Sequence, residues 1–223
     1  MVRIFLDGAD LALIRELESQ VDGFTTNPSL MKTTTITNYK AWASLVIDAS
    51  NHKPVSFEVV ADDFETMESQ AREIASWGDN VYVKIPACRT SGESSGSLIR
   101  CLSHEGIKVN VTAVMTLDQI NTLTRCLRAP AIFSIFCGRI ADTGRDPVPH
   151  ITQACRVKHA ETQILWASTR EVLNVKQAQS AGADIITMTP DLIRKMALFG
   201  KDLAEYSRET VAMFYNDGKR ITL

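Results

Sequence analysis

Several features that mark particular classes of protein are scarce in this sequence. The 223 residues include five cysteines, an odd number, which lie far apart with no C-x-x-C pair. This pattern excludes a disulfide scaffold, and we expect free thiols in a reducing compartment and no bound metal. The five are Cys88, Cys101, Cys126, Cys137 and Cys155.

The sequence also lacks a large excess of one charge and a long apolar run. The formal net charge is −2, so the chain has no broad basic field to attract nucleic acid or an anionic membrane. No apolar run approaches the length of a membrane span, and the apolar stretch near the amino terminus is too short for a signal peptide. We therefore expect a cytoplasmic protein without nucleic-acid or membrane partners.

The composition that is present is that of an ordinary folded protein, with 45% apolar and 22% charged residues. Short runs rich in β-forming residues alternate with longer stretches of helical period along the whole chain. The predicted strands are 3–7, 23–26, 55–60, 81–85, 107–112, 131–136, 163–168 and 184–187. The predicted helices are 10–19, 38–50, 64–77, 94–104, 116–127, 147–159, 171–180, 190–198 and 202–215.

Eight βα units without a linker predict one (β/α)8 TIM-type barrel domain over residues 1–223, with an extra C-terminal helix. An open, doubly wound sheet is the alternative. Such a sheet is favoured by a G-x-G-x-x-G fingerprint after the first strand. The turn at residues 7–10 reads DGAD instead.

Polar side chains recur at the carboxyl ends of the predicted strands, where buried parallel strands should be continuously apolar. In a barrel these ends converge on the face that carries active sites. Residues two apart share a face of a strand, so Glu58 opposes Phe57 and Lys84 opposes Val83. The polar set is Asp7, Asn27, Glu58, Lys84, Asn110, Thr112, Ser134 and Ser168, with Arg170 just beyond.

Lys84 is the candidate nucleophile of this set. Burial in a barrel favours the neutral amine, which is the form that attacks a carbonyl. The alternative is a lysine that extends from the strand end to solvent. The flanking apolar residues and the following Pro86 favour the strand interior.

Acid–base chemistry near Lys84 then falls to the carboxylates Asp7 and Glu58, acting directly or through water. Among the four histidines, only His150, in the segment TGRDPVPH, could approach the same face. The other three are predicted to be structural or surface residues.

Arg139, Ser168 and Arg170 would form a cationic pocket with a hydroxyl donor, a combination that suits a phosphate monoester. The alternative is that these arginines pair with the nearby Asp142 or Glu171. Convergence of two arginines with a serine favours phosphate.

Seven segments of the chain together resemble the transaldolase family, specifically its short members related to fructose-6-phosphate aldolase. In order they read FLDGAD, GFTTNPSL, SFEV, YVKIPA, NVTAV, SIFCGRIAD and WASTR. The resemblance runs over essentially the whole chain. It implies transfer of a dihydroxyacetone unit from fructose 6-phosphate or sedoheptulose 7-phosphate to an aldose phosphate, in the pentose phosphate pathway.

The resemblance also implies a role for each matching residue. Lys84 matches the Schiff-base lysine, and Asp7 matches the base that takes the proton of the ketose C4 hydroxyl. Glu58 matches an acid–base residue that works through a water held partly by Thr112. Asn27, Asn110 and Ser134 match the groups that hold the dihydroxyacetone hydroxyls, and Arg139, Ser168 and Arg170 match the phosphate clamp. The implied mechanism needs no metal or other cofactor.

Two positions separate the close relatives within this resemblance. The aldolase branch carries Gln at the position of Glu58 and Tyr at the position of Phe136, whereas transaldolases carry the residues found here. A tyrosine could orient a water and assist release of free dihydroxyacetone, which phenylalanine cannot do. Transaldolase activity is therefore expected, and fructose-6-phosphate aldolase activity is the alternative.

Two further alternatives are a non-catalytic sugar-phosphate-binding barrel and an isomerase that uses a carboxylate base without an imine. The short family members form pentamers and decamers, so a homo-oligomer is expected from the resemblance. The segment 202–223 carries a helical apolar stripe that could dock on its own barrel or on a neighbour.

Overall fold

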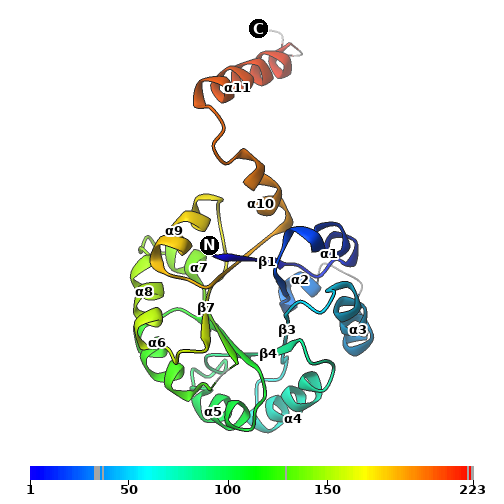
Figure 1. Cartoon of the computed structure of the whole chain (residues 1–223), viewed down its shortest axis with the longest axis vertical. Coiled ribbons are helices and arrows are strands. Elements are labelled where there is room, and N and C mark those ends of the chain that lie inside the picture. The colour runs from blue at the N-terminus through cyan, green and yellow to red at the C-terminus, as the bar shows by residue number, and fades with distance from the viewer. Residues whose placement is uncertain (33–35, 37, 129, 220, 222–223) are drawn as a thin grey trace.

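The computed structural model describes residues 1–32, 36, 38–128, 130–219 and 221. Its eight strands are parallel and form a closed barrel in sequence order, with β8 pairing back to β1 (Figure 1). The strands are β1 Arg3–Asp7, β2 Gly23–Thr25, β3 Val55–Glu58, β4 Val81–Pro86, β5 Val109–Val114, β6 Ala131–Ile135, β7 Thr162–Trp166 and β8 Ile185–Met188. The prediction of a (β/α)8 barrel is confirmed.

Helices follow the strands and surround the barrel. They are α1 Leu11–Leu17, α2 Pro28–Met31, α3 Tyr39–Ala49, α4 Phe64–Ala75, α5 Gly96–His104, α6 Leu117–Leu123, α7 Cys137–Ala141, α8 Val148–Val157, α9 Leu173–Ala181, α10 Pro190–Lys195 and α11 Leu203–Gly218, with 3-10 turns at Glu18–Gln20, Thr124–Cys126 and Met196–Leu198. The helix α4 begins at the cap Asp63, which accepts from the Thr66 amide, and Thr116 forms a capping box with Gln119.

Two short helices, α2 and α7, lie in segments where the sequence predicts no helix. They have four and five residues, too few for a 3.6-residue repeat to show. The strand β5 also differs from its prediction, because it begins two residues later and carries a bulge between Val111 and Val114. Ala113 in this bulge has φ 57°. A bulge of this kind redirects neighbouring side chains, here at the carboxyl end of the barrel.

The apolar residues form two layers, one between the strands and the helices and one inside the barrel. The inner layer contains Phe5, Tyr82, Ile132, Leu165 and Ile185. A Cβ at Gly23 would lie 2.5 Å from the Phe5 ring, so the glycine is what lets this ring fill the lumen. Tyr82, Ile132 and Ile185 of this layer lie near the amino ends of their strands, and the polar site residues lie near the carboxyl ends.

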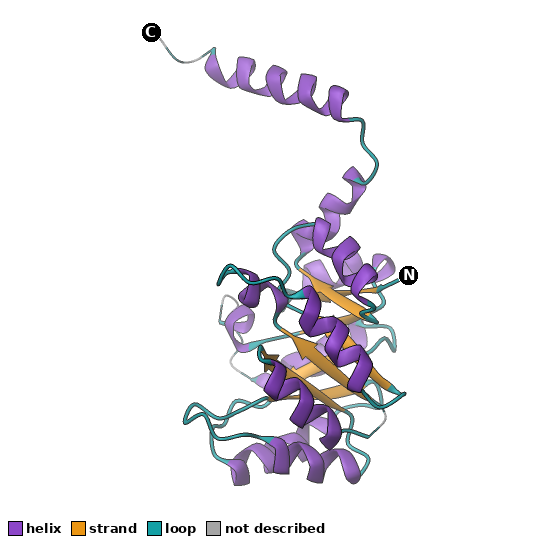
Figure 2. Ribbon diagram, turned by 90° about the vertical axis from the view of Figure 1, so that its left-hand side faces the viewer, coloured by secondary structure: helices purple, strands orange, loops and turns teal. Residues whose placement is uncertain are grey.

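The last helix, α11, stands away from the barrel in both views (Figures 1 and 2). None of its residues is buried. Its exposed large apolar side chains are Leu203, Tyr206, Val211, Met213, Phe214 and Tyr215. Residues 220, 222 and 223 of the predicted C-terminal stripe lie outside the described residues. Within the described ranges no helix, α11 included, is long and apolar enough to cross a membrane.

Candidate active site

The buried amine of Lys84 contacts one carboxylate and one backbone carbonyl. Lys84 lies opposite Glu58 in the register of β4 and β3, and its Nζ is 3.1 Å from Glu58 Oε2. The same Nζ donates a hydrogen bond of 2.7 Å to the carbonyl oxygen of Thr26. Lys84 is only 5% exposed, so the amine is inside the barrel and does not extend to solvent. The structure therefore places this candidate nucleophile in the barrel with a carboxylate close enough to exchange a proton.

The carboxylate of Asp7 lies at the end of a chain of hydroxyl groups. Thr25 Oγ1 donates to Asp7 Oδ1 at 2.8 Å and is 2.6 Å from Thr187 Oγ1. Asn27 Nδ2 also donates to Asp7 Oδ1, at 3.5 Å. Burial raises the pKa of Asp7, and the positive charge of Lys84 opposes this rise. A carboxylate with a raised pKa is a suitable acceptor for a substrate proton.

A cavity of about 460 Å³ opens above these groups. Six of the predicted site residues line it: Asp7, Asn27, Glu58, Phe136, Arg139 and Ser168. The remaining lining comes from Pro28, Ser29, Leu30, Ala113, Ala167 and Thr187. Lys84 does not line the cavity, but Glu58 reaches from the cavity wall to its amine.

Asn110, Ser134 and Thr112 are buried beside this cavity without lining it. Asn110 donates to Ser56 Oγ at 3.0 Å and accepts from Ser134 Oγ at 2.7 Å. The Thr112 hydroxyl is buried and has no hydrogen-bond partner among the described residues. These three predicted residues are therefore at the carboxyl end of the barrel, with the Thr112 hydroxyl able to bind a further polar group.

The three predicted phosphate-binding residues divide into two groups. Arg139 and Ser168 line the cavity, and Ser168 has φ 61°. A Cβ at Gly138 would lie 1.6 Å from the Ser168 carbonyl oxygen, so the close approach of α7 to this turn requires glycine. Arg170 instead forms a two-pronged ion pair with Asp142, with Nε–Oδ1 3.0 Å and Nη2–Oδ2 2.6 Å. This is the partner that the sequence offered as the alternative.

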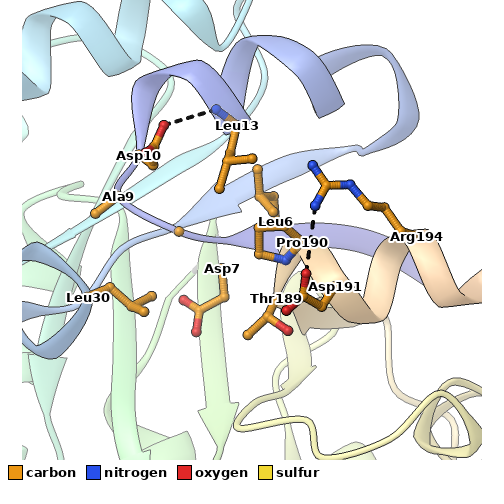
Figure 3. Close-up of a pocket in the computed structure, with 11 residues that line it drawn as sticks. Leu6, Asp7, Ala9, Asp10, Leu13, Leu30, Thr189, Pro190, Asp191 and Arg194 are labelled. Carbon is orange, nitrogen blue, oxygen red and sulfur yellow. Dashed lines mark hydrogen bonds and ion pairs between the residues drawn. The ribbon is translucent and has the colours of Figure 1, made fainter. Parts of the chain in front are cut away.

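A second cavity, of about 380 Å³, borders Asp7 on another side (Figure 3). Figure 3 shows the Asp7 carboxylate between Leu30 and Thr189. Leu30 lines both cavities, and Arg194, at the far side, pairs with Glu16 at 2.7 Å. Asp7 is therefore reached from two cavities.

His150 lies in the first turn of α8 and does not line either cavity. Its Nδ1 is buried without a hydrogen-bond partner among the described residues, and burial lowers the pKa of its ring. The five cysteines are free thiols. The structure thus gives no role in the site to these residues. No group of three or more His, Cys, Asp or Glu side chains in the described part of the chain is placed to hold a metal ion.

Some contacts of the site were not predicted, and three of them show how the sequence signal varies. The Thr26 acceptor is a backbone carbonyl, for which a pattern of side chains gives no signal. Thr187 lies two residues after Ile185 of the inner layer, so the alternation rule applied to β8 would have found it. Tyr39, whose hydroxyl contacts the backbone of Glu58, comes from helix α3 and has no sequence signal of its own.

The whole chain is similar to proteins of one family and to solved structures of the same fold. A family model described as transaldolase/fructose-6-phosphate aldolase matches residues 4–222. Among curated relatives, a probable transaldolase of Methanococcus maripaludis is 34% identical over 97% of each chain. One of Dehalococcoides mccartyi is 36% identical over 87% of this chain and 90% of its own. Among solved structures, 3-hexulose-6-phosphate synthase from Salmonella typhimurium has a TM-score of 0.62 at 14% identity, with 87% and 96% coverage, which indicates a shared fold.

Proposed function

We propose that this chain, which belongs to the transaldolase/fructose-6-phosphate aldolase family, transfers a dihydroxyacetone unit through a Schiff base on Lys84. Its activity is of the transaldolase type, a group transfer between sugars. The observation that carries the proposed mechanism is the 3.1 Å contact between Lys84 Nζ and Glu58 Oε2 inside the barrel.

In the first stage Glu58 accepts a proton from the Lys84 ammonium, and the free amine attacks the ketone carbon of the donor. The alkoxide formed by the attack takes one proton from the attacking nitrogen, and Glu58 then protonates the resulting hydroxyl, directly or through a water bound by Thr112. Water leaves and an iminium ion remains on Lys84. Asn27, Asn110 and Ser134 are proposed to hold the dihydroxyacetone hydroxyls, which requires the Asn110 and Ser134 pair to share its hydrogen bonds with the substrate.

In the second stage Asp7 takes the proton of the C4 hydroxyl, and the C3–C4 bond breaks. Its electron pair passes into the iminium, which becomes an enamine, and an aldose phosphate leaves. The enamine attacks the aldehyde of an acceptor, Asp7 returns the proton to the new hydroxyl, and hydrolysis frees the new ketose. The raised pKa of Asp7 favours it as the base and then the acid of this pair of steps.

The sugar phosphate is proposed to bind with its phosphoryl group at Arg139 and Ser168, which line the cavity. Arg170 joins this clamp by exchanging Asp142 for the phosphate. Phe136 contributes an apolar wall without a hydroxyl, which supports transfer over release of free dihydroxyacetone. We propose fructose 6-phosphate or sedoheptulose 7-phosphate as donors and the pentose phosphate pathway as the context.

The test is reduction with borohydride in the presence of fructose 6-phosphate, followed by intact mass and peptide mapping. A reduced adduct on Lys84 is expected, absent in Lys84→Ala and retained in Lys158→Ala, which removes another lysine held by a carboxylate. An adduct that survives Lys84→Ala would exclude the mechanism. No adduct in the unaltered chain would favour a binding barrel or an isomerase.

A transfer assay distinguishes transaldolase activity from the remaining alternative, aldolase activity. With erythrose 4-phosphate as acceptor, a transaldolase consumes both sugars and releases little dihydroxyacetone. Release of free dihydroxyacetone without transfer would instead favour the aldolase alternative.

We further propose that the protein is cytoplasmic and forms a homo-oligomer, a pentamer or decamer, in which α11 packs against a neighbouring copy. The support for packing is that α11 exposes its apolar side chains and buries no residue. Light scattering of the intact chain measures the number of copies.

A further inference from the structure

The phenol of Tyr39 forms hydrogen bonds with both backbone groups of Glu58. Its hydroxyl accepts a hydrogen bond of 2.9 Å from the Glu58 amide and donates one of 3.0 Å to the Glu58 carbonyl oxygen. One side-chain group thereby satisfies both backbone groups of the residue that contacts Lys84.

The need for this contact comes from the early end of β2. On the β2 side of β3, Phe24 donates to the Pro54 carbonyl and Thr26 donates to the Ser56 carbonyl. The amide and carbonyl of Glu58 would form the next contact on this side, because backbone groups two residues apart point the same way. The chain has left the sheet by then, since β2 ends at Thr25. The Tyr39 hydroxyl takes the place of the missing strand.

The ring of Tyr39 is itself fixed by a group of aromatic side chains. It stacks on Trp42 with ring centres 6.0 Å apart and meets Trp77 edge-on at 5.2 Å. Phe57, the residue before Glu58, packs against the same group with its ring 6.2 Å from that of Tyr39. The hydroxyl therefore has little freedom to move away from Glu58.

The carboxylate of Glu58 must be placed accurately, because it has to exchange protons with Lys84 and with the substrate. The backbone of Glu58 sets where its side chain starts, and a displacement of about 1 Å can cost about 100-fold in rate. We propose that Tyr39 is a positioning residue for the proton transfers of Glu58, an inference that rests on the proposed Schiff-base function. Tyr39 does not line the cavity, so it acts through Glu58 and not on the substrate.

The experiment is a double-mutant cycle of Tyr39→Phe and Glu58→Gln, with kcat, KM and the pH profile of kcat measured for fructose 6-phosphate. Rates are expressed per folded chain, with the folded fraction of each variant measured by far-ultraviolet circular dichroism, so chains that do not fold are not counted. Tyr82→Phe is the matched control, because it removes a hydroxyl from a ring in the inner layer.

Tyr39→Phe is expected to lower kcat about 10- to 100-fold, to change KM less than about threefold, and to shift the pH profile. In the Glu58→Gln background the same change should lower kcat less than about threefold, because the group that Tyr39 positions is gone. Tyr82→Phe should keep the wild-type kcat.

Equal losses in both backgrounds, or an unchanged kcat in Tyr39→Phe, would overturn the role of Tyr39 while leaving the adduct and the Schiff-base function intact. Absence of the adduct in the wild type would overturn the proposed function itself, and the role of Tyr39 with it.

Discussion

Glu58 and Lys84 occupy paired positions on neighbouring strands, and their charged groups meet at 3.1 Å inside the barrel. Parallel register alone sets this contact, because paired residues on adjacent strands send their side chains to the same face. The rest of the site is arranged around this pair.

Glu58→Gln should lower kcat by about 10²- to 10⁴-fold, because it removes the group that exchanges protons with the amine. Stopped-flow assays of transfer measure the loss. Glu18→Gln is the control, since Glu18 is also paired with a lysine, Lys53 at 2.6 Å, but at the other end of the barrel. A comparable loss in the control would mean that the effect is not specific to the site.

Asp7→Asn should abolish most transfer and also stabilise the protein at neutral pH. Because the folded-state pKa of Asp7 is raised, its contribution to stability falls as the pH rises from the unfolded value through the folded value. At pH 7 asparagine avoids the cost of a buried charge, so Tm should rise by about 2–4 °C, the shift that about 1 kcal/mol produces in a domain of this size.

Calorimetry over a range of pH tests the predicted increase in the Tm of Asp7→Asn. The gain in Asp7→Asn should shrink as the pH falls through the folded-state pKa of Asp7, because the buried carboxyl of the wild type is then neutral. A lower Tm for the variant at pH 7 would contradict it. In the wild type, the acid limb of kcat should lie above the ordinary range of aspartate for the same reason.

Phe136→Tyr should increase the release of free dihydroxyacetone relative to transfer by about tenfold or more, because a hydroxyl in the cavity wall can orient a water. An enzymatic assay of dihydroxyacetone with and without erythrose 4-phosphate gives the ratio. Phe64→Tyr, which adds a hydroxyl on the outer helix α4, serves as the control. An unchanged ratio would remove Phe136 as the determinant of reaction outcome.

Gly138→Ala should raise KM for phosphorylated donors and lower stability. The new Cβ would lie 1.6 Å from the Ser168 carbonyl oxygen, and backbone cannot move aside as a flexible side chain does. The expected cost is about 1–3 kcal/mol, as for other overpacked sites. Gly218→Ala, which has no atom within 4 Å of its new Cβ, is the control, and denaturant unfolding with steady-state kinetics compares the two.

Removal of residues 203–223 should leave a folded barrel of changed oligomeric state. The helix α11 has no buried residue, so the barrel loses little of its own core when α11 is deleted. Size-exclusion chromatography with light scattering should show fewer copies per particle, and far-ultraviolet circular dichroism should show a folded chain. An unchanged particle size would contradict a role for α11 in assembly.

The alternation of side chains along strands was sufficient to predict the barrel and to bring Asp7, Glu58 and Lys84 to one end. These residues lie in regular strands, where the face of each side chain follows from its position. The same reasoning could not specify the partner of Arg170, because Glu171 is adjacent in sequence whereas Asp142 is 28 residues away and reaches Arg170 only through the fold.

Irregular backbone explains the other features of the site that the sequence did not predict. Ala113 and Ser168 have positive φ without being glycine, and neither conformation follows from residue type. Tyr39 lies at the start of a helix, and its contact with Glu58 depends on where β2 ends. Strand ends are among the least reliable features of a sequence-based prediction.

The ion pair between Arg170 and Asp142 has a consequence for selectivity among anions. An intramolecular carboxylate is always present at high effective concentration, so it competes with every anion that approaches Arg170. Chloride or a monoanionic carboxylate offers the guanidinium no more than Asp142 already does. A phosphate dianion, which can also contact Arg139 and Ser168, offers more. If Arg170 has the proposed role, a ligand must bind its guanidinium more strongly than Asp142 does before it can displace this carboxylate.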